Sequence, residues 1–258
     1  MQTAALEALG LGREWSYEAI EMPPADFPEL TAALPTEGFV GANVTIPHKE
    51  AALALAHFAS AAANEIGAAN TLSFRDTEIR ADNTDAPGLL AALPDSPAGQ
   101  RALVLGAGGS ARAAAWALAG QGARVEVWNR TSERAEELAA SLSGFVAAGG
   151  GQLAAVNAET ASSASYELIV NCTAVGMGEE DPFAELPLEP DSLRAGVTIV
   201  DLVYVGGETE LARAGRGGGA AVVEGLEVLV RQGAESLHIW TGLDPPLDVM
   251  REAARGGG

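Results

Sequence analysis

The chain has 258 residues, with 35 acidic against 15 basic side chains and a formal net charge of −20. So acidic a surface argues against sequence-independent capture of nucleic acid, which needs basic side chains to displace counterions from phosphates. We expect no membrane partner, because no run reaches the roughly 18 apolar residues of a spanning helix and the N-terminus lacks the pattern of a secretion signal. A single cysteine, Cys172, and the lack of any His/Cys cluster at zinc-ligand spacing predict a cytoplasmic protein without disulfide or metal.

The first region of the chain is predicted to mix strands with helices. Short runs rich in β-branched and aromatic residues predict strands near 16–20, 41–46 and 71–74. The end of the chain reads as two helices, over 226–240 and 247–255.

The middle of the chain alternates short apolar runs with alanine-rich stretches. This alternation is typical of βαβ units and of a parallel sheet, so we assign the protein to the α/β class. The first predicted strand is followed by a helix over 110–119, and the second by a helix over 132–142. The predicted strands are 102–105, 125–128, 168–170, 198–200 and 221–223.

A glycine-rich turn lies between the first of these strands and its helix. It reads Gly106-Ala107-Gly108-Gly109-Ser110-Ala111 and matches the Gly-x-Gly-x-x-Gly/Ala pattern of dinucleotide-binding folds in its required context. Gly106 permits the tight turn, Gly108 lets backbone amides approach a pyrophosphate, and Ala111 lets the helix pack closely on the strand. The unpaired amides at the start of the helix then favour a bound anion.

The end of the second strand indicates which dinucleotide is bound. NAD sites usually place an acid about 20 residues after the glycines, where it holds the ribose hydroxyls. This chain instead has Asn129-Arg130-Thr131, with Arg134 one turn further on. Since two guanidinium groups suit a 2′-phosphate, the sequence favours NADP over NAD.

Lys49 is the only lysine of the chain, although arginine is common. A lysine amine can give up and regain a proton, whereas a guanidinium stays charged, so arginine could not replace a proton donor here. Three polar clusters, 43–45, 67–71 and 83–85, each end or follow a predicted strand. Ligands bind outside the carboxyl ends of strands in open α/β sheets, so the clusters predict one cleft in which Asp85 is the partner of Lys49.

A series of motifs resembles one family, the shikimate dehydrogenases, which reduce 3-dehydroshikimate to shikimate with NADPH in aromatic amino acid biosynthesis. The resemblance implies a catalytic and substrate domain, residues 1–85 completed by 226–258, and a Rossmann-like NADP-binding domain, residues 86–225. The matching stretches keep the family's order over nearly the whole chain: 43–49, 67–71, 83–88, 106–111, 129–131, 171–177, 201–204, and 232–234 with 240–242.

The same resemblance implies a role for each site residue. Lys49 is the acid/base, Asp85 is its partner and also contacts the substrate, and Asn70 binds a substrate hydroxyl. The remaining substrate residues are Thr45, Tyr204 and Gln232. Leu202 and Gly225 border the nicotinamide, and the other cofactor residues are Gly106, Ala107, Gly108, Gly109, Ser110, Asn129, Arg130, Thr131 and Arg134. We expect shikimate or 3-dehydroshikimate as the small-molecule substrate, and a monomer or a homodimer.

The start of the chain departs from the family pattern. Family members begin with a strand and a Ser-x-Ser-Pro segment whose hydroxyls hold the substrate carboxylate, whereas Met1 to Gly10 corresponds to the helix that follows. That strand lies inside the family's sheet, so without it neighbouring backbone groups lose partners, at roughly 1–3 kcal/mol for each buried group. Either the natural chain starts upstream of Met1 or the carboxylate clamp has been lost. The intact downstream motifs favour the first explanation.

Three alternatives remain open at this stage. The first is a quinate/shikimate dehydrogenase with broader cofactor use, against which Arg130 argues. The second is a non-catalytic NADP-binding homologue, which the missing serines would permit. The third is another dehydrogenase with a similar nucleotide domain, such as a methylene-folate enzyme, which would not account for Asn70, Asp85 and Gln232 together.

Overall fold

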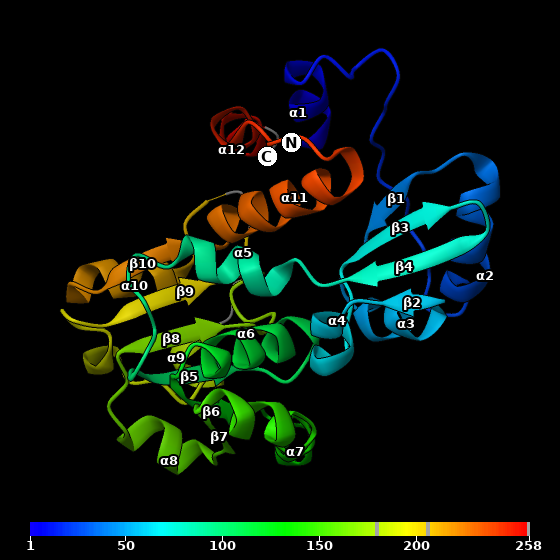
Figure 1. The fold of residues 1–258 in the computed structure, drawn as a ribbon. Coiled ribbons are helices and arrows are strands. Elements are labelled where there is room, and N and C mark those ends of the chain that lie inside the picture. Colours follow the sequence, from blue (N-terminus) through cyan, green and yellow to red (C-terminus); the bar gives the residue numbers. More distant parts are fainter. Residues whose placement is uncertain (179–180, 205–206, 257–258) are drawn as a thin grey trace. The chain divides into compact units, whose positions relative to one another are not determined.

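The computed structural model describes residues 1–178, 181–204 and 207–256 (Figure 1). The chain forms two compact units, and both boundaries fall inside helices. Unit 1 contains Met1–Gly88 and the chain from Leu229 through the last helix, and unit 2 contains Leu89–Val228. Among the described residues, no helix is long and apolar enough to cross a membrane.

Unit 2 is built on a six-stranded sheet in which every neighbouring pair is parallel. Its spatial order, β10-β9-β8-β5-β6-β7, is the doubly wound order of dinucleotide-binding folds, with the switch point between β5 and β8. The predicted α/β class with a Rossmann-like parallel sheet is thereby confirmed. The strands are β5 Arg101–Leu105, β6 Arg124–Trp128, β7 Gln152–Ala155, β8 Leu168–Asn171, β9 Thr198–Asp201 and β10 Ala221–Glu224.

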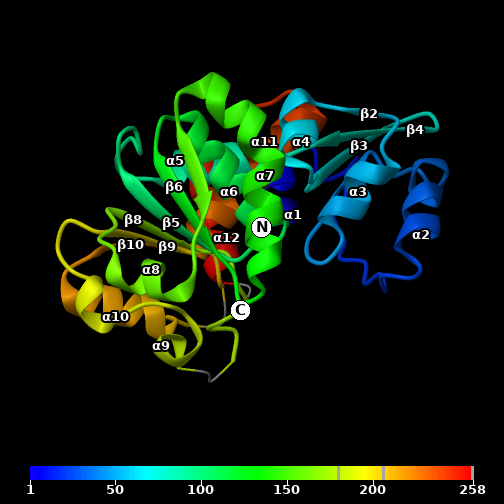
Figure 2. The same ribbon diagram turned by 90° about the horizontal axis from the view of Figure 1, so that it is seen from below.

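Helices cover both faces of this sheet (Figure 2). Side chains of β5 alternate between the two cores: Ala102 and Val104 pack under α6 and α7, while Leu103 and Leu105 face the opposite side. This alternation is the period-2 geometry of a strand that is buried on both faces, and it explains why β5 is apolar from Ala102 to Leu105. The helices of unit 2 are α6 Gly109–Gly120, α7 Ser132–Gly149, α8 Ala158–Ser163, α9 Pro182–Glu185, α10 Glu210–Gly218 and the 3-10 turn η2 Pro190–Ser192.

Unit 1 contains a smaller, mixed sheet of order β1-β3-β4-β2. The central pair is antiparallel, and β2 joins β4 in parallel. Helices α2, α3 and α4 lie beside this sheet (Figure 1), and Phe27, Leu72 and Ile79 belong to its core. The elements are α2 Phe27–Ala33, η1 Leu34–Glu37, β1 Gly41–Asn43, α3 Lys49–Leu55, β2 Phe58–Ala59, α4 Ala61–Ile66, β3 Thr71–Arg75, β4 Glu78–Asp82 and α5 Asp85–Ala92.

Three helices from opposite ends of the sequence pack together in unit 1. They are α1 Gln2–Ala8, α11 Gly225–Thr241 and α12 Leu247–Arg255. Leu6, Leu237 and Met250 are buried between them. The Gln2 side chain donates to the backbone oxygen of Gly233 at 2.9 Å, which ties α1 to α11.

The strand predicted near 16–20 is wrong, because residues 15–23 form no regular secondary structure. A local sequence pattern can indicate an extended segment, but it does not show whether another strand lies beside that segment. Here the Tyr17 hydroxyl donates to the Asn43 side chain at 3.0 Å. The strand predicted over 41–46 ends at Asn43. Three strands, β2, β4 and β7, were not predicted, two of them with only partly buried side chains.

Candidate functional site

The site in unit 1 is built around Lys49, the first residue of α3, and Asp85, the first residue of α5. Lys49 Nζ lies 2.6 Å from Asp85 Oδ2, and the two side chains are only 10% and 17% exposed. A short contact between charged groups, largely shielded from water, is stronger than a surface ion pair and fixes the direction of the amine. The carboxylate at the first turn of α5 is also favoured by the positive end of the helix dipole.

Asn70, at the end of the loop before β3, connects this pair to the rest of the site. Its Oδ1 accepts from the backbone amide of Thr84 at 2.7 Å, which fixes the orientation of the side-chain amide. Its Nδ2 therefore faces Asp85 and donates to Oδ1 of that carboxylate at 2.9 Å. The two carboxylate oxygens of Asp85 are thus held separately, one by Lys49 and one by Asn70.

Gln232, on α11, completes the group. Its Nε2 donates to the backbone oxygen of Leu229, so its Oε1 is turned toward Asn70 Nδ2, 3.0 Å away. Asn70 Nδ2 also lies 2.9 Å from the Thr84 hydroxyl. An amide nitrogen carries two protons, so Asn70 Nδ2 can donate to only two of Asp85, Thr84 and Gln232 at once. Thr84 can donate to Gln232, but only at 3.4 Å.

Ser236 is a member of this network that the sequence reasoning missed. It is fully buried, one turn after Gln232 on α11, and donates to the Gln232 backbone oxygen at 3.0 Å. Its hydroxyl also lies 2.8 Å from Thr71 Oγ1 and 3.1 Å from Thr84 Oγ1. The i, i+4 spacing to Gln232 places both side chains on one helix face, and this was the available signal.

Of the predicted substrate residues, the structure brings Asn70, Asp85 and Gln232 together beside Lys49. Thr45 lies outside this network, is exposed, and lines a groove of about 490 Å³ between residues 16–24 and 39–48. Tyr204 belongs to unit 2, follows β9, and is 49% exposed.

The glycine turn of unit 2 follows β5 and opens α6, as the sequence pattern predicts. Gly106 has a φ of +107°, a backbone conformation that residues with a side chain rarely adopt. Gly108 is the N-cap of α6, and no side chain caps the helix there. A Cβ on Gly108 would meet no protein atom within 4 Å, and no acid lies in the first turn. The space in front of the α6 amides therefore fits a phosphate group. Ala107, Gly109 and Ser110 form the rest of the turn.

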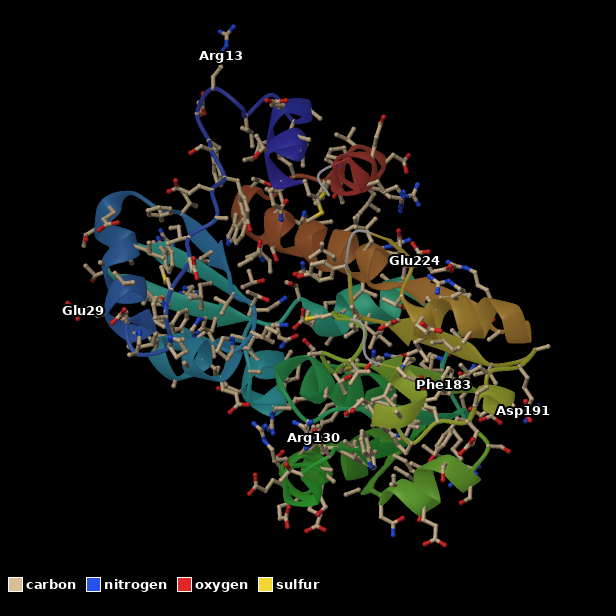
Figure 3. The ribbon with its side chains drawn as sticks, turned by 180° about the vertical axis from the view of Figure 1, so that it is seen from behind. Arg13, Glu29, Arg130, Phe183, Asp191 and Glu224 are labelled. Atoms are coloured by element: carbon tan, nitrogen blue, oxygen red, sulfur yellow. The ribbon has the colours of Figure 1, made fainter. Side chains whose placement is uncertain are left out.

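The residues after β6 also fit a phosphorylated ribose. Arg130 and Arg134 are exposed, and Arg130 lies at the surface near the start of α7 (Figure 3). Within the described chain, neither guanidinium is paired with an acid in an ion pair, so both can bind an anionic group. The Asn129 side chain donates to the backbone oxygen of Thr131 at 2.8 Å, which holds the turn before the helix.

Leu202 and Gly225 meet at the carboxyl end of β9. A Cβ on Gly225 would come within 2.7 Å of the Leu202 carbonyl carbon, so only glycine allows these backbones to approach so closely. Sequence reasoning gave no role to the buried polar residues that end β8 and β9, Asn171 and Asp201. Their signal was a polar residue closing an otherwise apolar strand.

Comparisons with known proteins agree over the whole chain. The description "Shikimate dehydrogenase substrate binding domain" matches residues 1–72, "Shikimate / quinate 5-dehydrogenase" matches 90–180, and "Shikimate 5'-dehydrogenase C-terminal domain" matches 225–255. A shikimate dehydrogenase (NADP(+)) of Methanocella arvoryzae is 40% identical over 99% of this chain and 92% of its own length.

Solved structures show the same likeness. The shikimate 5-dehydrogenase of Thermus thermophilus, in complex with NADP(H) and shikimate, is 41% identical with a TM-score of 0.85, over 100% of this chain and 93% of that one. The quinate dehydrogenase of Corynebacterium glutamicum, in complex with NAD, is 30% identical with a TM-score of 0.82, over 97% and 92%. With identity at this level along nearly its full length, the chain belongs to the shikimate dehydrogenase family.

Proposed function

We propose that this protein is an NADP-dependent shikimate dehydrogenase, which reversibly reduces 3-dehydroshikimate to shikimate in aromatic amino acid biosynthesis. The observation that carries the proposal is the shielded contact of 2.6 Å between Lys49 and Asp85, joined through Asn70 to Gln232. An amine, a carboxylate and two amides in one cluster suit a ligand with several hydroxyl groups, because each hydroxyl both donates and accepts.

Lys49 is proposed as the general acid and base. During reduction its ammonium gives a proton to the oxygen that develops negative charge, and during oxidation its amine takes that proton back. Asp85 holds Nζ in place through both states, while Asn70 and Gln232 bind substrate hydroxyls. Thr45 and Tyr204 are proposed as further substrate-binding residues. The bound cofactor supplies the hydride, and the protein supplies position and charge.

NADP is the proposed cofactor. The backbone amides of the glycine turn, Gly106 to Ser110, hold the pyrophosphate at the start of α6. Arg130 and Arg134 hold the 2′-phosphate, and Asn129 and Thr131 shape the turn before α7. Leu202 and Gly225 are proposed to border the nicotinamide. In this assignment unit 1 is the catalytic and substrate domain, and unit 2 is the NADP-binding domain.

The direct test is the absorbance of NADPH formed from NADP and shikimate by the purified chain. We expect turnover with shikimate and NADP, and kcat/KM at least about tenfold lower with NAD, as the loss of charge-assisted contacts to the 2′-phosphate would give. An absence of NADPH formation by a folded protein that binds NADP would favour the non-catalytic homologue.

A quinate dehydrogenase is the second candidate, because the similar enzyme of Corynebacterium glutamicum carries that name. The assay separates the two candidates when quinate and shikimate are each offered with NADP and with NAD. Faster turnover of quinate with NAD would select the second candidate. Arg130 and Arg134 support the first, because they match the extra phosphate of NADP.

We further propose a cytoplasmic enzyme that acts as a monomer or homodimer. The chain has a single cysteine, Cys172, and so cannot form an internal disulfide, which fits a reducing compartment. Sedimentation of the purified protein at several concentrations distinguishes the two oligomeric states.

A further inference from the structure

Asp201 is a carboxylate buried at the end of β9 in unit 2, only 1% exposed. None of the ion pairs among the described residues includes it, and its oxygens accept hydrogen bonds instead. Oδ2 accepts from the Thr209 hydroxyl at 2.6 Å, and Oδ1 accepts from Asn171 Nδ2 at 2.9 Å and from the Val203 amide at 3.3 Å. A buried charge is retained only where such donors surround it.

These donors come from three different segments. Val203 belongs to the loop after β9, Asn171 ends β8, and Thr209 is the cap of α10, where its oxygen accepts from the Ala212 amide at 3.1 Å. One side chain thus fixes the loops after two neighbouring strands and the start of a helix. All three lie at the carboxyl edge of the sheet, where doubly wound folds bind their ligands.

The network continues from Asn171 toward the glycine turn. Asn171 Oδ1 accepts from the amide and the hydroxyl of Thr173, at 3.1 and 2.7 Å. A Cβ on Gly106 would lie 3.2 Å from the Cys172 oxygen and 3.4 Å from Thr173 Cγ2, so this loop packs directly on the turn. Asp201 also directly precedes Leu202, which packs against Gly225.

We propose that Asp201 is a positioning residue for the nicotinamide half of the cofactor: through Asn171 and Val203 it holds the loops after β8 and β9 in the arrangement that receives the ring. The proposal rests on the proposed function. Asp201 touches neither cofactor nor substrate and acts through the loops. The adenosine half depends on Arg130 and the α6 amides, which the Asp201 network does not include.

The central variant is Asp201→Asn, which keeps the shape and removes the charge. A matched control is Tyr166→Phe, which removes a buried hydrogen bond of 2.6 Å to Glu126 in the same unit, away from the Asp201 network. Two probes are titrated by calorimetry: NADP, and adenosine 2′,5′-bisphosphate, which lacks the nicotinamide half.

We expect Asp201→Asn to weaken NADP binding about tenfold, the size of a lost charge-assisted hydrogen bond, and to leave the bisphosphate unchanged. Tyr166→Phe should lower the melting temperature and alter neither affinity. Equal weakening of both probes by Asp201→Asn, or no weakening of NADP, overturns the proposal.

Thr173→Val keeps the test decisive if Asp201→Asn does not fold. It removes the hydroxyl that donates to Asn171 Oδ1 and accepts from the Val175 amide, and it keeps a methyl group beside Gly106. Thr173→Val should also weaken the binding of NADP and leave the binding of the bisphosphate unchanged. An unchanged affinity for NADP would overturn the proposal. A wild-type protein that binds NADP without oxidising shikimate would refute the proposed function, while the affinity comparison would still decide the role of Asp201.

Discussion

At the scale of single residues, the proposed proton chemistry depends on one amine. Lys49 is its only lysine, and its Nζ lies 2.6 Å from Asp85 in a largely shielded position. Arginine serves elsewhere as a surface cation, as in the contact of 2.7 Å between Arg101 and Glu126. The difference in side-chain chemistry, rather than in charge, separates the two kinds of site.

Replacing Lys49 by methionine should lower kcat about 10²- to 10⁴-fold, because the general acid and base is lost while the volume of the side chain is kept. The affinity for NADP, measured by calorimetry, should stay within about twofold, because Lys49 lies in unit 1 and the predicted cofactor residues lie in unit 2. An unchanged kcat would remove Lys49 from the mechanism.

Arg130→Ala should raise the KM for NADP about tenfold and leave the KM for NAD unchanged, since only NADP carries the phosphate that the guanidinium binds. Arg124→Ala is the matched control, because Arg124 is exposed at the opposite end of the same strand. Equal effects of the two substitutions would show a general loss of positive charge rather than a specific contact.

Burial raises the pKa of Asp201 above its ordinary value of 3.8, although three donated hydrogen bonds oppose the shift. The folded state therefore holds this proton more tightly, and the contribution of Asp201 to stability is present at low pH and is lost as the pH rises through the folded pKa. Relative to wild type, Asp201→Asn should thus gain stability as the pH rises above the ordinary pKa of 3.8, as measured by urea unfolding. A difference that stays constant with pH would contradict this.

At the scale of elements, the glycine turn, the parallel sheet and the terminal helices followed from the sequence. Strong local signals produced them: Gly106 and Gly108 in context, and β5 apolar on both faces. The residues of the candidate site, such as Lys49 and Asp85, lie in motifs that are distant in sequence. The family resemblance supplied the roles that were predicted for them. The i, i+4 spacing places Ser236 on the same helix face as Gln232, but it does not show that this face meets Thr71 and Thr84, so Ser236 was missed.

Helix α5 approaches α11 so closely that only glycine fits at the contact. A Cβ on Gly88 would lie 2.8 Å from the Gln232 Cβ and backbone nitrogen. Gly88→Ala should therefore destabilise the protein by about 1–3 kcal/mol through overpacking and raise the KM for shikimate by displacing Gln232. Urea unfolding and steady-state kinetics measure the two effects.

The matched control is Gly144→Ala, also in a helix, where a Cβ would meet nothing within 4 Å. It should stabilise the protein by about 0.5–1 kcal/mol, because alanine loses less backbone freedom than glycine on folding. If Gly88→Ala were as stable as wild type, α5 could shift away from α11 without any loss of stability, which would contradict the prediction.

At the scale of the whole molecule, an acidic chain of net charge −20 must bind an anionic cofactor through local groups. Arg130, Arg134 and the α6 amides are the groups proposed for this role in unit 2, while Lys49 lies in unit 1. Each unit has its own hydrophobic cores and its own sheet. We therefore expect each ligand to stabilise mainly the unit that binds it.

Amide hydrogen exchange can measure this division. NADP alone should slow exchange most in the glycine turn and the start of α7, and shikimate alone should slow it most around Asn70, Asp85 and Gln232. Strongest protection of the Asn70 region by NADP alone would contradict the assignment of the cofactor to unit 2.

The surplus of acceptors around Asn70 determines how the site meets a ligand. Asn70 Nδ2 can donate to two of its three neighbours, of which Gln232 Oε1, 3.0 Å away, is the farthest. An alcohol that arrives with its own hydrogen can satisfy Gln232 without displacing any bond that the free protein needs. The acceptors around Asn70 are thus arranged for a polyol, whose hydroxyls can donate to them, rather than for a ring without hydroxyls.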